Sequence, residues 1–189
     1  MRLVRAAAAA VAGVALLAGC SEGRQANETL PSTSSTAAES SEALQPLGPP
    51  DFPMPIEARQ QTEAGAQAFT HYYIALINRL PATLDASPLK EFSSSCETCD
   101  RIARDAESDK AAGYTYRGGT LSITSLGGAA LSDDAAELAF VVDQAPLDVL
   151  DATGTPIAEL SSPQLKDLPA GLSLTWSEGH WLVSNLSFG

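Results

Sequence analysis

The chain has 189 residues, of which 11 are basic and 23 are acidic, so its formal net charge is −12. Proteins that bind nucleic acid need a basic surface, and no cluster of lysine and arginine is found here, so a nucleic-acid partner is excluded. The same balance argues against a second, electrostatic contact with a membrane, because polybasic segments make such contacts.

The first residues combine a short basic head with an apolar run. Arg2 and Arg5 precede an apolar stretch that extends from Ala6 to Leu17. This order is typical of a signal peptide. A helix that spans a bilayer needs about 20 apolar residues, and this run is shorter. We therefore predict a signal peptide over residues 1–19.

The signal peptide would end in a cysteine motif. Leu17-Ala18-Gly19-Cys20 resembles the lipobox of bacterial lipoproteins, in which the cysteine receives a diacylglyceryl group before a peptidase cuts in front of it. An ordinary secretory signal is the alternative. Two acyl chains hold a protein durably at a membrane. The resemblance implies that Cys20 is a lipid anchor, and that the protein is held on the extracytoplasmic face of the cell membrane.

A polar segment follows the anchor. Residues 20–57 are rich in Ser, Thr, Glu, Ala, Gln and Pro and contain few large apolar side chains, so they bury too little surface to offset chain entropy. We predict a disordered tether there. Residues 58–189 have the length of a single globular domain.

The globular part begins with expected helices. Thr62 is a candidate N-cap, and apolar residues then recur at three- and four-residue spacing from Ala66 to Leu80, which predicts an amphipathic helix that ends before Pro81. A short helical piece is expected between Leu84 and Phe92.

A third helix is expected from about Cys96 to Ala112. The serines of residues 93–95 are candidate caps at its start. Gly113 is the expected stop, since glycine readily ends a helix.

From Tyr114 onward, short runs rich in β-branched and aromatic residues predict strands. Asp133-Asp134, Thr153-Gly154 and Glu178-Gly179 are expected at hairpin connections. Helices followed by an antiparallel sheet predict an α+β fold in which the helices cover one face of the sheet. The expected strands are 120–125, 136–143, 147–150, 157–160, 172–176 and 181–188.

Two resemblances follow from these motifs. The aromatic first helix and the closing hairpin Trp176-Ser177-Glu178-Gly179-His180-Trp181 resemble the NTF2-like superfamily, which implies a cone-shaped α+β domain. Together with the lipobox, the tether, the stretch from Ala66 to Tyr73 and the Cys96/Cys99 pair, they resemble a family of actinobacterial lipoproteins of unknown function. That family implies no activity.

Cys96 and Cys99 are the thiols that remain once Cys20 is lipidated. An extracytoplasmic location favours their oxidation to a structural disulfide. A redox pair is the alternative, because a cysteine near a helix N-terminus has a lowered pKa. A zinc site is a further alternative, but the two histidines, His71 and His180, are distant in sequence.

Few other side chains suggest chemistry. His71 is expected on the polar, solvated side of the first helix with Gln67 and Asn78, and His180 in a hairpin turn. Asp143 is the one carboxylate at the end of an apolar strand, where an exposed acid is expected. We therefore name no catalytic residue, metal or cofactor.

Four aromatic residues remain: Tyr72, Tyr73, Trp176 and Trp181 are expected in the core, with a pocket lining as the alternative. The sequence thus predicts a lipid-anchored module that binds an envelope protein, a wall component or a small apolar ligand without catalysis. A small-molecule dehydratase or isomerase and a thiol-disulfide protein are the alternatives.

Overall fold

The structure is a computed structural model that describes residues 45–189, so the predicted signal peptide, Cys20 and most of the predicted tether lie outside the described residues. No helix in the described part is long and apolar enough to cross a membrane. The helices are η1 (Ile56–Arg59), α1 (Glu63–Thr83), α2 (Ser87–Glu91) and α3 (Glu97–Ala112). The strands are β1 (Thr115–Gly118), β2 (Leu121–Leu126), β3 (Ala130–Ser132), β4 (Ala135–Gln144), β5 (Leu147–Leu150), β6 (Leu165–Ser177) and β7 (His180–Phe188).

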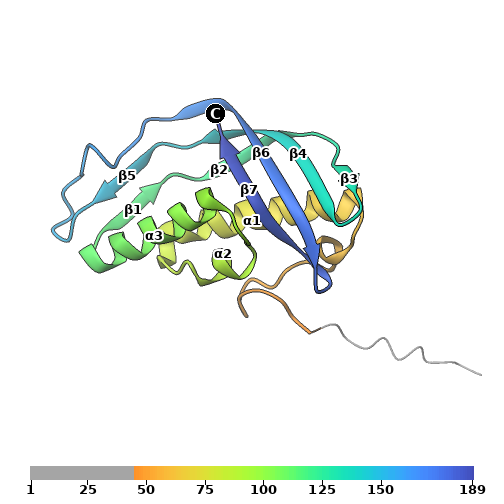
Figure 1. The fold of residues 1–189 in the computed structure, drawn as a ribbon. Coiled ribbons are helices and arrows are strands. Elements are labelled where there is room, and N and C mark those ends of the chain that lie inside the picture. The colour runs from red at the N-terminus through yellow and green to blue at the C-terminus, as the bar shows by residue number, and fades with distance from the viewer. Residues whose placement is uncertain (1–44) are drawn as a thin grey trace, which may run out of the picture. The chain divides into compact units, whose positions relative to one another are not determined.

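The domain has two layers. Strands β2, β4, β6 and β7 pair in that order, β3 also pairs with β4, and β1 and β5 form a separate two-stranded sheet. Every one of these pairings is antiparallel. Figure 1 shows the strands curving over the three α-helices, which all lie on the same side. The predicted α+β fold, with helices on one face of a curved antiparallel sheet, is confirmed.

Helix α1 starts where the sequence predicted and ends later. The hydroxyl of Thr62 accepts a hydrogen bond from the Gly65 N–H at 3.0 Å, which caps the first turn. The helix then continues through Pro81, so the predicted end was wrong. Proline lacks an N–H, but so close to the end it removes a single helical bond. Leu84, with φ 46°, terminates the helix by donating its N–H to the Leu80 carbonyl at 2.8 Å.

Helix α3 is capped by a cysteine. The Cys96 sulfur accepts a hydrogen bond from the Cys99 N–H at 3.2 Å, so the serine caps that we predicted were wrong. Gly113 adopts φ 73° and ends the helix as predicted. Cys96 and Cys99, which form the disulfide, therefore lie at the N-cap and in the first turn of α3.

The closing hairpin agrees with the sequence prediction. Glu178 and Gly179 have φ values of 50° and 82°, which is the conformation that a tight two-residue turn requires. Elsewhere β1 and β3 were not predicted. The expected strand over 157–160 was wrong, because this segment is a turn in which Ser161 donates its N–H to the Ile157 carbonyl at 3.1 Å.

The ordered domain starts before the predicted boundary at residue 58. Residues 45–57 were expected in the tether, yet Met54 is buried, and the Phe52 ring stacks on Tyr72 with centroids 5.4 Å apart. The Tyr72 hydroxyl donates to the Phe52 carbonyl at 3.2 Å. Apolar side chains between the prolines therefore attach this segment to α1.

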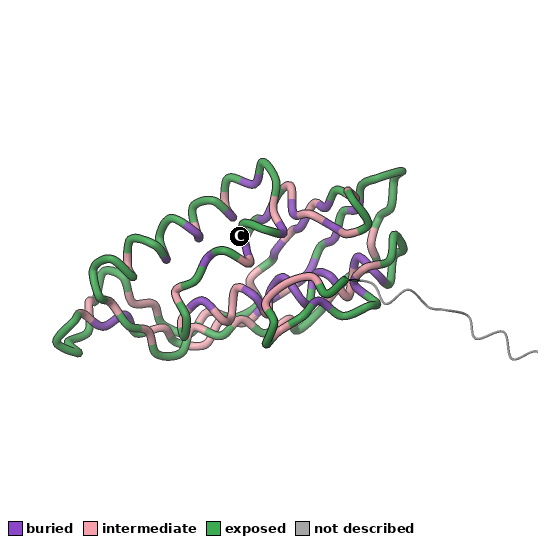
Figure 2. The backbone as a smooth tube through the Cα atoms, turned by 90° about the horizontal axis from the view of Figure 1, so that it is seen from below, coloured by how far each residue is buried: buried purple, intermediate pink, exposed green. Residues whose placement is uncertain are grey.

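Aromatic side chains fill the core at one end of the domain. Phe69, Tyr73, Phe92 and Trp181 are fully buried, and Phe69 contacts Phe92 edge to face at 6.3 Å. Figure 2 shows that the opposite end, which carries β1 and β5, is mostly exposed or half-buried. The buried aromatic side chains are therefore gathered at one end, whereas at the other end Val149 and Leu150 of β5 are buried.

Each edge strand of the main sheet is hydrogen-bonded to the helical layer at one residue. Val183 of β7 donates its N–H to the Phe92 carbonyl at 2.8 Å and accepts from the Ser94 N–H at 2.9 Å. At the other edge, the Asn78 side chain of α1 donates to the Leu121 carbonyl at 2.9 Å and accepts from the Leu121 N–H at 2.8 Å. At these two positions the edge groups are already paired and cannot pair with another chain.

Candidate ligand-binding cavity

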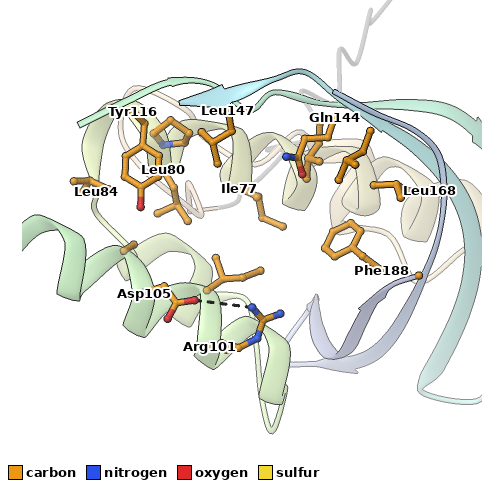
Figure 3. A pocket seen from close by; sticks show the side chains of 17 residues that line it. Ile77, Leu80, Leu84, Arg101, Asp105, Tyr116, Gln144, Leu147, Leu168 and Phe188 are labelled. Atoms are coloured by element: carbon orange, nitrogen blue, oxygen red, sulfur yellow. Dashed lines mark ion pairs between the residues drawn. The ribbon is translucent and has the colours of Figure 1, made fainter. Parts of the chain in front are cut away.

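A cavity of about 380 Å³ lies between α1, α3 and the strands (Figure 3). Most of the side chains that surround it are aliphatic, and most of these are only half-buried. Its lining consists of Ile77, Leu80, Pro81, Leu84, Arg101, Ile102, Asp105, Ala106, Tyr116, Gly119, Leu121, Gln144, Leu147, Leu165, Leu168, Phe188 and Gly189.

The helix walls follow from helical spacing. Ile77, Leu80 and Leu84 recur at three and four residues along α1 and its cap, so they share a face. On α3, Ile102 and Ala106 are four residues apart and face the same space. Because Ala106 is small, α3 leaves room there that a larger side chain would fill.

The strands supply the opposite wall. Leu147 begins β5, Leu165 and Leu168 lie on β6, and Phe188 ends β7. Figure 3 shows Leu168 and Phe188 on one side of the cavity and Leu147 with Tyr116 on the other. The strands diverge at this end into the main sheet and the separate β1–β5 pair, which keeps the wall open.

Few polar side chains reach the cavity. Arg101 and Asp105 of α3 form a loose ion pair with 3.9 Å between nitrogen and oxygen, and their side chains are 61% and 65% exposed. The Gln144 amide donates to the Ser162 hydroxyl at 2.8 Å. The charged groups therefore lie at the rim, and the Gln144 amide is already hydrogen-bonded to Ser162.

Tyr116 closes one side of the rim. Its hydroxyl donates to the carboxylate of Asp109 on α3. Burial raises the pKa of Tyr116, and the hydrogen bond to Asp109 and the charges of Asp109 and Asp105 raise it further. Tyr116 therefore stays protonated at neutral pH and acts as a donor to Asp109.

The titratable residues that the sequence singled out lie elsewhere. His71 is exposed on α1, and the His180 ring packs edge to face against Phe92 at 5.9 Å. The Asp143 carboxylate accepts a hydrogen bond from the N–H of Asp167, a residue with φ 53°. Asp143 thus stabilises an irregular strand segment, and none of these three residues lines the cavity.

Cys96 and Cys99 form the predicted disulfide, with Cα atoms 5.2 Å apart. Both residues are buried, with exposed fractions of 1% and 2%. The structure does not bring His71 or His180 to them as metal ligands: within residues 45–189 no group of three or more His, Cys, Asp or Glu side chains is arranged to hold a metal.

The predicted core aromatics belong to the packed end. Tyr72, Tyr73 and Trp181 are buried, and half-buried Trp176 contacts Trp181 at 4.9 Å between ring centroids. The Trp181 indole N–H donates to the Gln60 carbonyl at 3.0 Å. None of the four lines the cavity, so they are core residues.

The sequence did not reveal the cavity. Its walls come from aliphatic residues of several helical turns and strands, and such residues also build ordinary cores. The one available signal is that the buried residues of α3, among them Ala103 and Ala106, are small. That signal has meaning only once the opposing strands are known.

Comparisons with known proteins place the chain in a family. The model of a family of unknown function, DUF6318, matches residues 48–187. No curated protein matches the chain. The expectation of a family without a known activity is thereby confirmed, whereas the expected actinobacterial origin stays a prediction.

Several solved structures are similar to this chain. The intermembrane space region of chloroplast protein ARC6 is 13% identical with a TM-score of 0.50, and the match covers 68% of this chain and 97% of that one. The protein Aln2 from a Streptomyces species is 12% identical with a TM-score of 0.42, covering 68% and 91%. A variant of Rd1NTF2_05, which carries NTF2 in its name, is 10% identical with a TM-score of 0.38, covering 66% and 99%. At these identities the likeness concerns the fold alone.

Proposed function

The chain belongs to the DUF6318 family, whose function is unknown, and from this premise we propose that its domain is a binding module for a small apolar ligand. The observation that carries the proposal is the cavity of about 380 Å³ with its mainly aliphatic walls. Pockets that bind small molecules have volumes of about 300 to 1,000 Å³ and are lined mostly by apolar side chains with a few polar groups. This cavity has both properties.

A ligand would cover surface that is otherwise exposed to water. Leu147, Leu165, Leu168 and Phe188 are half-buried around the cavity. Burial of apolar surface contributes about 25 cal/mol per Å². Occupation of the cavity would therefore be favourable, and its volume, which lies in the range of small-molecule pockets, favours a small apolar ligand over a partner protein or a wall component.

The geometry favours binding over proton-transfer catalysis. A dehydratase or isomerase needs a general base within hydrogen-bond reach of its substrate. The described residues that line the cavity include no histidine, and the one acidic side chain among them, Asp105, is mostly exposed at the rim.

The burial of Cys96 and Cys99 favours a structural disulfide over one that takes part in thiol-disulfide exchange. Exchange requires a thiolate of the attacking protein to reach a sulfur atom. Cys96 and Cys99 are buried at the start of α3, where the Cys96 sulfur also accepts the capping hydrogen bond. This burial supports a structural disulfide.

We further propose that Cys20 carries a diacylglyceryl group, which anchors the protein to the outer face of the cell membrane. The support is the lipobox Leu17-Ala18-Gly19-Cys20 after an apolar run. Metabolic labelling with palmitate in a bacterial host is expected to label the chain and to fail with Cys20→Ser. Equal labelling of the two proteins would refute the anchor.

The binding proposal is tested by filling the cavity. Dodecanol, an uncharged single-chain probe, is titrated into the purified Cys20→Ser chain and its Ala106→Phe variant by calorimetry. Phenylalanine at position 106 occupies the space between α3 and the strands, so we expect binding to fall at least about ten-fold, the loss that corresponds to about 1.4 kcal/mol. Ala111→Phe, on the exposed side of the same helix, is the matched control. Equal affinities in all three proteins would refute the proposal.

A further inference from the structure

One cationic side chain stands at the mouth of an otherwise apolar cavity. Of the 17 lining residues drawn in Figure 3, Arg101 is the one that carries a positive charge. The figure shows its guanidinium on the side of α3 that faces Ile77 and Phe188. An arginine in this position can contact the end of a molecule whose apolar part lies deeper inside.

The Arg101 guanidinium has free donors. Its ion-pair partner is Asp105, with 3.9 Å between Nη1 and Oδ2, which is too long for a hydrogen bond. A guanidinium carries five N–H donors in a planar fork that matches a carboxylate in two parallel hydrogen bonds. Arg101 is therefore weakly engaged within the domain.

The other polar groups around the cavity are less available. The Tyr116 hydroxyl donates to Asp109, and the Gln144 amide donates to Ser162. The carboxylates one helical turn from Arg101 on α3 are Glu97 and Asp105; both residues are exposed, and the Asp105 side chain is 65% exposed. The side chains of the remaining lining residues are uncharged.

From this arrangement we propose that the ligand of the cavity is a single-chain carboxylic amphiphile of the fatty-acid type, whose carboxylate pairs with Arg101 while its chain lies against Ile77, Leu168 and Phe188. This inference rests on the proposed binding function and adds the chemistry of the ligand head group. A fatty acid is chosen over an uncharged chain because an alcohol carries no charge and one oxygen, so it cannot form the paired, charge-assisted hydrogen bonds that a carboxylate forms with a guanidinium. It is chosen over an amine because an ammonium group would be repelled by Arg101.

The test compares three ligands with the same chain. Dodecanoate, dodecanol and dodecylamine are titrated separately into the purified Cys20→Ser chain by calorimetry at neutral pH and low salt. We expect dodecanoate to bind most tightly. Arg101→Gln is expected to weaken dodecanoate about five-fold, as for a charge pair at an exposed rim, and to leave dodecanol unchanged.

Two further variants sharpen the test. Arg104→Gln removes the same charge from an exposed position on α3 outside the cavity lining, so it controls for the change in net charge. Asp105→Asn removes the competing carboxylate and is expected to tighten dodecanoate about two-fold. Because Arg101 and Asp105 are both exposed, these changes are expected to leave the fold intact, as circular dichroism can check.

The outcomes separate this inference from the function on which it rests. Tighter binding of dodecylamine than of dodecanoate, or equal effects of Arg101→Gln and Arg104→Gln, would refute the carboxylate head group while the apolar cavity still binds dodecanol. Failure of all three ligands to bind would refute the proposed function and this inference together.

Discussion

Asn78 links helix α1 to a strand that lines the cavity. It lies on α1, and its side-chain amide makes two hydrogen bonds to the backbone of Leu121, at 2.9 Å and 2.8 Å. Leu121 begins β2 at the edge of the main sheet and also lines the cavity. The substitution Asn78→Ala removes both hydrogen bonds and leaves the N–H and the carbonyl of Leu121 without these partners.

The magnitude follows from the number of bonds and their burial. Each hydrogen bond contributes about 0.5 to 1.5 kcal/mol net, and a buried group left unpaired costs about 1 to 3 kcal/mol. Both bonds here are partly buried, so water replaces some of the loss. We expect Asn78→Ala to lower the free energy of unfolding by about 2 kcal/mol, which is about 4 to 8 °C in Tm for a domain of this size.

Urea and thermal unfolding, followed by circular dichroism, measure this effect. Asn185→Ala is the matched control, because Asn185 is exposed on β7 and the same atoms are removed. A surface change of this kind is expected to stay within about 0.5 kcal/mol of the unsubstituted chain. If the two variants unfold at the same urea concentration, the bonds between α1 and β2 do not stabilise the domain and the reasoning is refuted.

Two further predictions concern the disulfide and a buried tyrosine. Joint replacement of Cys96 and Cys99 by alanine is expected to cost about 2 kcal/mol in urea unfolding, because the short loop constrains the unfolded chain modestly; a loss above about 5 kcal/mol would contradict this role. Burial is the main cause that raises the pKa of Tyr72 to about 12 from 10.0. Since the unfolded chain then ionises first, stability is full below pH 10 and falls as the pH rises towards 12. Alkaline unfolding of the Tyr72→Phe variant should be less steep, and an unchanged slope would count against this cause.

The parts of the fold that the sequence predicted are those with strong local signals. Thr62 caps the start of α1 and Gly113 ends α3, and both signals lie in the residue itself. Glu178-Gly179 likewise favours a tight turn whatever surrounds it. The Cys96/Cys99 pair was equally visible, because its three-residue separation is itself local.

The errors arose where tertiary contacts override local signals. Pro81 normally ends a helix, but here the last turn continues past it. Residues 45–57 have the composition of a tether, and yet Phe52 and Met54 attach them to the domain. A few well-placed apolar side chains can outweigh the average composition of a segment.

The candidate site was hidden for a different reason. Asn78 was expected on a solvated face, but its amide holds β2, and Arg101 was one surface cation among several. Their roles depend on strands that lie far away in the sequence and meet the helices only in the folded domain. Periodicity identifies the inner face of a helix, but it does not show whether the opposing wall fills the space.

The location of a bound ligand tests the central claim most directly. Nuclear magnetic resonance of the Cys20→Ser chain with dodecanoate is expected to show intermolecular contacts from the ligand methylenes to the methyl groups of Leu80, Ala106 and Leu168, which line the cavity. Contacts confined to residues outside the cavity, such as Leu131 on the exposed surface of β3, would contradict the claim that this cavity is the binding site.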